Sequence, residues 1–249
     1  MGEAIWNFQK RNFCSSLHVM PGSLSKWQMA GLILASAMLW MHYIQSKDRR
    51  QPEPRRLLLA AFGLGVLACV LSALCLSGLE ALGLPDLKLG ERPWTAFYCF
   101  GIVGPLEEGT KVLVACLIVY RWREYDEPLD GFVYAAAIAL GFACMENLFD
   151  SSDLGWQRQL ARTIALPITH VLFSSIWGFG LGYARFCVSH PVRRKLWQIG
   201  SVVLAMLVHG LYDFLIFAYE ATFVTSGLAL VIWIFVIWRA GSLSRQEMD

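Results

Sequence analysis

The clearest pattern along the chain is a series of long apolar runs separated by short polar connections. A run of about 20 apolar residues is long enough to cross a bilayer as an α-helix. We predict seven such helices, at about residues 27–44, 57–82, 95–120, 130–149, 162–186, 196–218 and 222–239. The connections are short and no internal repeat stands out. The predicted fold class is therefore all-α, a polytopic transmembrane helical bundle that forms one membrane domain.

Composition agrees with this interpretation. The chain has 249 residues, of which 56% are hydrophobic and 16% charged, and its mean hydropathy is +0.49. Soluble proteins carry about 25% charged residues. The lipid bilayer is thus an expected partner, and a multi-pass protein of the cell membrane is the expected setting. The net charge of +2 gives no sign of nucleic-acid binding, because the basic residues lie in short connections.

Lysine and arginine are concentrated in alternate connections, which predicts an orientation. Cytoplasmic connections of membrane proteins carry an excess of these residues. The basic connections predicted to be cytoplasmic contain Lys47, Arg49, Arg50, Arg55 and Arg56, then Arg121 and Arg123, then Arg185, Arg193, Arg194 and Lys195. We therefore expect residues 1–26 to be an extracytoplasmic segment, residues 27–239 the transmembrane domain, and residues 240–249 a cytoplasmic tail.

Three polar clusters interrupt the apolar runs. They are Glu107-Glu108-Gly109-Thr110-Lys111, Phe142-Ala143-Cys144-Met145-Glu146-Asn147 and His209-Gly210-Leu211-Tyr212-Asp213. An ionisable side chain inside a membrane costs a few kcal/mol or more, so it usually faces a polar interior and functions there. On the predicted orientation, the three clusters and His170 lie at a similar depth in the outer half of the membrane. We expect them to form one site.

Spacing within each helix indicates how these groups pair. Lys111 lies four residues after Glu107 and three after Glu108, so it can pair with either carboxylate. Asp213 lies four residues after His209 and could orient its imidazole. Four carboxylates around one lysine would leave a net charge of about −3, which requires shared protons or a bound cation. Either arrangement suits water activation, by a carboxylate base or by a metal.

The order EExxK, FxxxE and HxxxD on successive predicted helices resembles the PrsW intramembrane proteases of the wider CAAX-protease and Abi superfamily. The flanking segments Asp130-Gly131-Phe132-Val133-Tyr134 and Thr169-His170 agree, and the resemblance covers roughly residues 95–218. It implies an endopeptidase that cleaves a single-span membrane protein, typified by an anti-sigma factor, on its outer side. By contrast, no HExxH or GxGD sequence is present.

Carried over to this chain, the resemblance assigns water activation to Glu107 and Glu108, and oxyanion stabilisation or proton transfer to His209. The remaining candidate catalytic residues are Lys111, which balances charge, Glu146, which positions water or metal, and Asp213, which orients His209. Zinc is a candidate cofactor, since Glu146, His170 and His209 could supply ligands from three helices. The sequence leaves open whether any metal is bound, and it leaves His170 open to a packing role.

Two other functions fit the same pattern. Intramembrane Glu, His and Asp relays also serve proton- or ion-coupled transporters, although no repeated half-structure with broken helices is evident here. A non-catalytic membrane scaffold could keep a protease-like core, although all three motifs are intact.

Overall fold

The computed structural model describes residues 26–46, 51–85, 87, 91–149, 156–219 and five positions between 225 and 232. Over these residues the fold is all-α, which confirms the predicted class. The elements are α2 (Lys26–Gln45), α3 (Arg55–Ala81), α4 (Arg92–Tyr98), the π-helix η1 (Cys99–Val103), α5 (Gly104–Leu117), the 3₁₀-helix η2 (Val119–Arg121), α6 (Asp130–Phe149), α7 (Trp156–Phe186) and α8 (Pro191–Tyr219).

Four helices are long and apolar enough to cross a membrane: Arg55–Ala81, Asp130–Phe149, Leu160–Phe186 and Pro191–Tyr219. The protein is therefore a membrane protein with several candidate spans. The predicted span at 95–120 is divided among α4, η1 and α5, and α2 is also outside this group of four. The predicted span at 222–239 lies mostly outside the described residues. Seven crossings thus remain a prediction.

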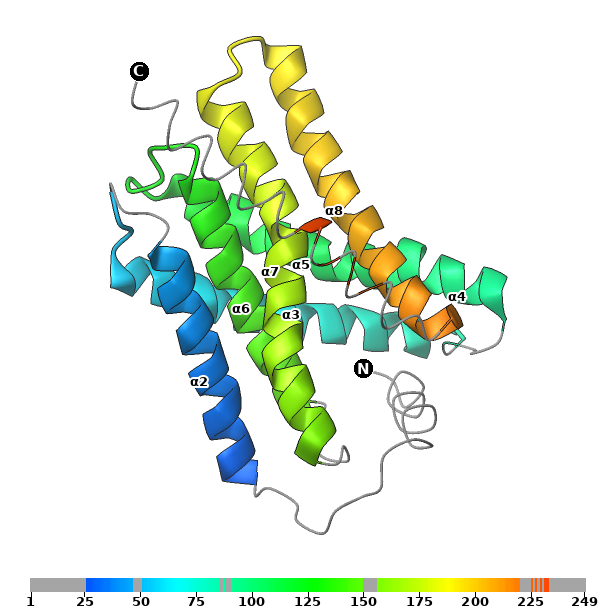
Figure 1. Cartoon of the computed structure of the whole chain (residues 1–249). Coiled ribbons are helices and arrows are strands. Elements are labelled where there is room, and N and C mark those ends of the chain that lie inside the picture. Colours follow the sequence, from blue (N-terminus) through cyan, green and yellow to red (C-terminus); the bar gives the residue numbers. More distant parts are fainter. Residues whose placement is uncertain are drawn as a thin grey trace.

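Helix α6 occupies the centre of the bundle. Every residue from Asp130 to Cys144 is buried, and many of these residues are alanine or glycine, which lets neighbouring helices approach closely. A Cβ atom added at Gly65 of α3 would collide with the Ile138 carbonyl, and one added at Gly141 would collide with the Phe62 carbonyl. In Figure 1, α2, α6 and α7 run side by side, while α3 and the α4–α5 run cross them steeply.

The α4–α5 run contains a π turn immediately before the glutamate pair. Pro105 has no backbone N–H, and in a regular α-helix its ring would collide with the carbonyl of Gly101. The chain accommodates this proline by widening into η1 at Cys99–Val103 and then continuing as α5. The proline therefore affects the direction in which the following residues of α5 project.

A second proline, Pro167, lies inside α7. It cannot donate to the carbonyl of Thr163 one turn earlier, and a buried carbonyl left without a partner is costly. The hydroxyl of Ser36 on α2 donates to this carbonyl at 2.9 Å. The contact joins α2 to the part of α7 that carries the candidate site.

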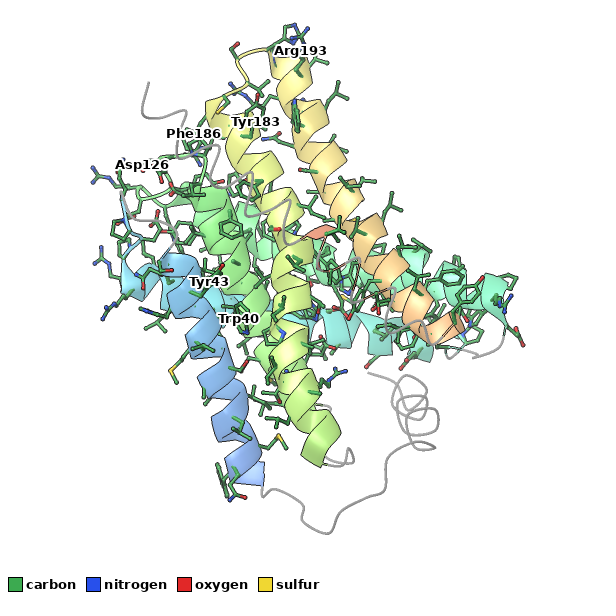
Figure 2. The ribbon with its side chains drawn as sticks, viewed as in Figure 1. Trp40, Tyr43, Asp126, Tyr183, Phe186 and Arg193 are labelled. Carbon is green, nitrogen blue, oxygen red and sulfur yellow. The ribbon has the colours of Figure 1, made fainter. Side chains whose placement is uncertain are left out.

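The three basic connections lie at one end of the bundle. Arg56, in the first turn of α3, pairs with Glu124 at 3.5 Å, and Arg185 at the end of α7 donates to the Tyr120 carbonyl at 2.7 Å. Figure 2 shows Asp126, Phe186 and Arg193 in the upper part of the molecule. This shared end agrees with the positive-inside pattern, and the direction of the bundle across the membrane remains a prediction.

Candidate active site

The three sequence clusters, far apart in the chain, meet around one cavity of about 180 Å³. Helices α7 and α8 line it with residues three or four apart, so that each presents one face. The cavity is lined by Val103, Glu107, Glu146, Arg162, Ala165, Leu166, Thr169, His170, Phe173, His209, Tyr212, Asp213, Ile216 and Phe217. Its walls are therefore apolar, with acidic and imidazole groups gathered in one part.

Glu108 is wholly buried and is contacted through both carboxylate oxygens. Its Oε1 lies 2.8 Å from Lys111 Nζ and 3.1 Å from His209 Nδ1. Its Oε2 accepts hydrogen bonds from Ser174 Oγ at 3.0 Å and from Trp177 Nε1 at 2.9 Å. Glu108 does not line the cavity. Its surroundings hold it in place and leave no lone pair directed at a substrate.

Glu107 has different surroundings, although it is the adjacent residue. Its Oε2 is buried and has no hydrogen-bond partner among the described residues. The nearest basic groups are His209 Nε2 at 3.7 Å, and Lys111 Nζ and His170 Nδ1, each at 4.0 Å. Because Glu107 lines the cavity, it is the member of the pair whose oxygen can meet a water molecule or a cation.

His170 connects the lysine to Glu146. Its Nδ1 lies 2.8 Å from Lys111 Nζ, and its Nε2 lies 2.9 Å from Glu146 Oε2. Since the lysine ammonium can only donate, Nδ1 accepts, and Nε2 carries the proton that faces Glu146. Arg162 donates to the other oxygen of Glu146 at 2.9 Å. Lys111 is fully buried and also lies 3.9 Å from the centre of the Phe142 ring.

His209 contacts Glu108 and Phe173 in addition to Asp213, the partner expected from the sequence. Asp213 was expected to orient this imidazole, and its Oδ2 does lie 3.6 Å from His209 Nε2. Glu108 lies closer, at 3.1 Å from Nδ1, and Phe173 stacks on the ring with centroids 4.7 Å apart. Glu108 and Phe173 therefore make the closest contacts with the imidazole, while Asp213 lines the cavity beside it.

Glu107, His170 and His209 form the group with potential for metal binding. Each offers one ligand atom, and these atoms all lie within 4.8 Å of one another. The ligand set expected from the sequence contained Glu146 in place of Glu107. In the structure Glu146 lies 2.9 Å from both Arg162 and His170, whereas the nearest basic groups to Glu107 are 3.7–4.0 Å away. The Oε2 atoms of both glutamates lack a hydrogen-bond partner among the described residues. The orphaned oxygen of Glu107 and the cavity-facing Nε2 of His209 fit a metal, and His170 would have to give up one of its two contacts.

Sequence reasoning missed three residues of this cluster: Arg162, Ser174 and Trp177. Ser174 and Trp177 lie four and seven residues after His170, which places them on the same face of one helix. That spacing was a usable signal. Arg162 was not singled out, although it opens the predicted helix 162–186 and lies eight residues before His170, on a neighbouring face of that helix. Asn147, beside Glu146, is buried but does not line the cavity.

Comparison with known proteins leads to the same family as the three sequence clusters. Residues 53–240 match the family described as PrsW family intramembrane metalloprotease. The chain is 33% identical to Protease PrsW of Geobacillus kaustophilus over 201 residues, 80% of this chain and 85% of the relative. It is 33% identical to Protease PrsW of Bacillus subtilis over 186 residues, 74% and 81% of the two chains. It is 26% identical to Protease PrsW of Clostridioides difficile over 212 residues, 84% and 86% of the two chains.

The chain belongs to the PrsW family of intramembrane proteases. It is accordingly a peptidase of the membrane, with a protein as its class of substrate. No solved structure matches the chain.

Proposed function

We propose that this protein is an endopeptidase that cleaves a single-span, membrane-anchored protein near the outer side of the membrane. The observation that carries the proposal is the unpartnered oxygen of Glu107 in the wall of the cavity, beside His170 and His209. A buried carboxylate without a hydrogen-bond partner is costly unless it has a function or binds a ligand. An anti-sigma-factor-like protein is the proposed substrate, as the family resemblance implies.

In the proposed reaction, Glu107 takes a proton from a water molecule as that water attacks the carbonyl carbon of the scissile peptide bond. The oxyanion that forms lies in the cavity, where Arg162 is the lining residue with a permanent positive charge. Glu107 then returns the proton to the departing amide nitrogen as the C–N bond breaks. Glu108 and Lys111 do not touch the substrate, and they hold His209 and His170 in position.

The family description includes a metal, and the residues fit one. Glu107, His170 and His209 would hold it, as a carboxylate and two imidazoles commonly hold zinc. Such an ion would supply Lewis-acid polarisation of the carbonyl and acidify a bound water. Glu107 would be required on either account, as the general base or as a ligand of the cation.

The proposed side of cleavage follows from the position of the cavity along the bundle. Glu146 lies roughly 24 Å along α6 from Asp130, at about 1.5 Å per residue. Asp130 is at the end of α6 where the basic connections gather. If those connections are cytoplasmic, as their charge predicts, the cavity lies in the extracytoplasmic half of the membrane.

The proposal is tested with the Glu107→Gln variant in proteoliposomes that contain a single-span candidate substrate. Loss of a general base lowers turnover by about a hundredfold or more, so we expect cleavage to fall at least that far. The matched control is Glu91→Gln, because Glu91 is exposed and lies outside the cavity. Mass spectrometry of the fragments gives the scissile bond and its depth. Unchanged cleavage by the Glu107→Gln variant would rule out the mechanism.

A further inference from the structure

The hydrogen bonds around Glu108 show which neighbouring groups act as donors and which atoms act as acceptors. The indole N–H of Trp177 and the ammonium of Lys111 can only donate. They contact different oxygens of Glu108, at 2.9 Å on Oε2 and 2.8 Å on Oε1. Both oxygens of Glu108 therefore act as acceptors.

This assignment determines the tautomer of His209. The Nδ1 atom of His209 lies 3.1 Å from the same Oε1 that accepts from Lys111. Because that oxygen accepts, Nδ1 must carry the proton. The lone pair of a neutral His209 then lies on Nε2, which faces the cavity at 3.7 Å from Glu107 Oε2. An imidazole in the other tautomer would direct an N–H into the cavity in place of the lone pair.

We propose that Trp177, together with Ser174, is a positioning residue that fixes Glu108 and thereby selects the tautomer that His209 presents to the cavity. Neither residue lines the cavity, and both are buried, at 1% and 0% exposure. Their hydrogen bonds occupy Oε2, so that Oε1 stays directed at His209. The inference rests on the proposed function, because it assigns these residues to the same reaction.

The first test is the Trp177→Phe variant, which keeps an aromatic ring and removes the N–H donor. A hydrogen bond to a charged group contributes enough that its loss changes a rate by about tenfold to a hundredfold. We expect kcat to fall within that range while KM changes by about twofold or less, since Trp177 does not touch the substrate. The Ser174→Ala variant should shift kcat in the same direction by a smaller factor.

Two matched controls separate positioning from packing. Trp197→Phe removes the same donor from an exposed tryptophan on α8. Ser175→Ala removes a buried hydroxyl that donates to the Leu172 carbonyl instead of to Glu108. Both control variants should retain wild-type kcat. If Trp177→Phe fails to fold, Ser174→Ala compared with Ser175→Ala still tests the proposal.

The second test does not depend on catalysis. In the purified protein with ¹⁵N-labelled histidine, the His209 signals, identified by their loss in His209→Gln, should report a proton on Nδ1. The Trp177→Phe variant should show a mixture of tautomers. An unchanged kcat with an unchanged His209 spectrum, or a changed KM alone, would overturn the inference. If Glu107→Gln leaves cleavage intact, the proposed function fails while the spectrum still decides the tautomer.

Discussion

Gly104 of α5 and Gly210 of α8 cross at backbone contact distance, and this crossing brings Glu107 within reach of His209. A Cβ atom added at Gly104 would lie 2.6 Å from the Met206 carbonyl oxygen and 3.1 Å from the Gly210 nitrogen. One added at Gly210 would lie 2.8 Å from the Cys99 carbonyl oxygen. His209 directly precedes Gly210, so any increase in the helix separation also moves the imidazole away from α5.

The first prediction concerns this crossing. The Gly210→Ala variant must separate α8 from η1, because the added Cβ atom would lie against Cys99 and Phe100, and such overpacking costs about 1–3 kcal/mol of stability. We expect cleavage to fall by about tenfold or more, because the side chains around Glu107 lose their spacing. Thermal unfolding in detergent and a cleavage assay measure the two effects.

Gly200→Ala on the same helix is the matched control. Gly200 is exposed, and an added Cβ would meet nothing within 4 Å. Alanine favours a helix over glycine by up to about 1 kcal/mol, so this variant should be at least as stable as the wild type and fully active. Equal behaviour of the two variants would show that the Gly104–Gly210 crossing does not set the site.

The second prediction separates the adjacent glutamates by stability. Glu108→Gln replaces one acceptor oxygen with an NH₂ group, which then faces either the donor-only Lys111 or the donor-only Trp177. A buried donor left against another donor costs about 1–3 kcal/mol, and more beside a charge. Glu107→Gln changes a carboxylate whose Oε2 has no hydrogen-bond partner within the described part of the chain. We therefore expect a lower Tm for Glu108→Gln and little change for Glu107→Gln, and the reverse order would contradict the assignment.

The third prediction concerns Arg162. Its guanidinium donates to Glu146 at 2.9 Å, and the other oxygen of Glu146 contacts His170. Arg162→Gln should loosen Glu146 and lower cleavage by about tenfold, within the range for a lost hydrogen bond to a charged group. Arg193→Gln, at an exposed position at the other end of the molecule (Figure 2), should cleave at the wild-type rate. Initial rates on one substrate at saturating concentration make the comparison.

The fourth prediction addresses the metal. We expect a strong chelator to reduce cleavage and added zinc to restore it, because a site of one carboxylate and two imidazoles suits that ion. Elemental analysis of purified protein should show that His209→Gln loses bound metal. His190→Gln, which changes an exposed histidine outside the cavity, should retain it. Equal metal content in both variants would place any bound ion elsewhere.

Much of the architecture could be predicted from the chain alone, because hydropathy and periodicity are local properties. The apolar runs predicted an all-α membrane protein, and six of the seven predicted runs fall on described helices. The predicted run at 95–120 matched less well, because the structure divides it among α4, η1 and α5. Pro105 was visible in the sequence, yet hydropathy does not report its effect, the π turn that divides the run.

The identity of the polar groups was also available from the sequence. An ionisable residue in an apolar run stands out wherever its helix is placed, so Glu107, Glu108, Lys111, Glu146, His170, His209 and Asp213 were found without coordinates. The helical spacing of Lys111 from the two glutamates predicted the ion pair that forms, because both partners lie on one helix.

Only the tertiary structure decided what each group contacts. It separated Glu107, with its free oxygen, from Glu108, which has four contacts. It also showed that Glu108 lies closer to His209 than Asp213 does, placed Glu107 with His170 and His209 in a group that could hold a metal, and brought Ser174 and Trp177 to the site. The physical reason is that contacts between helices depend on how each helix is rotated about its axis and on how closely the two helices approach. For α5 and α8, the close backbone approach at Gly104 and Gly210 fixes this arrangement.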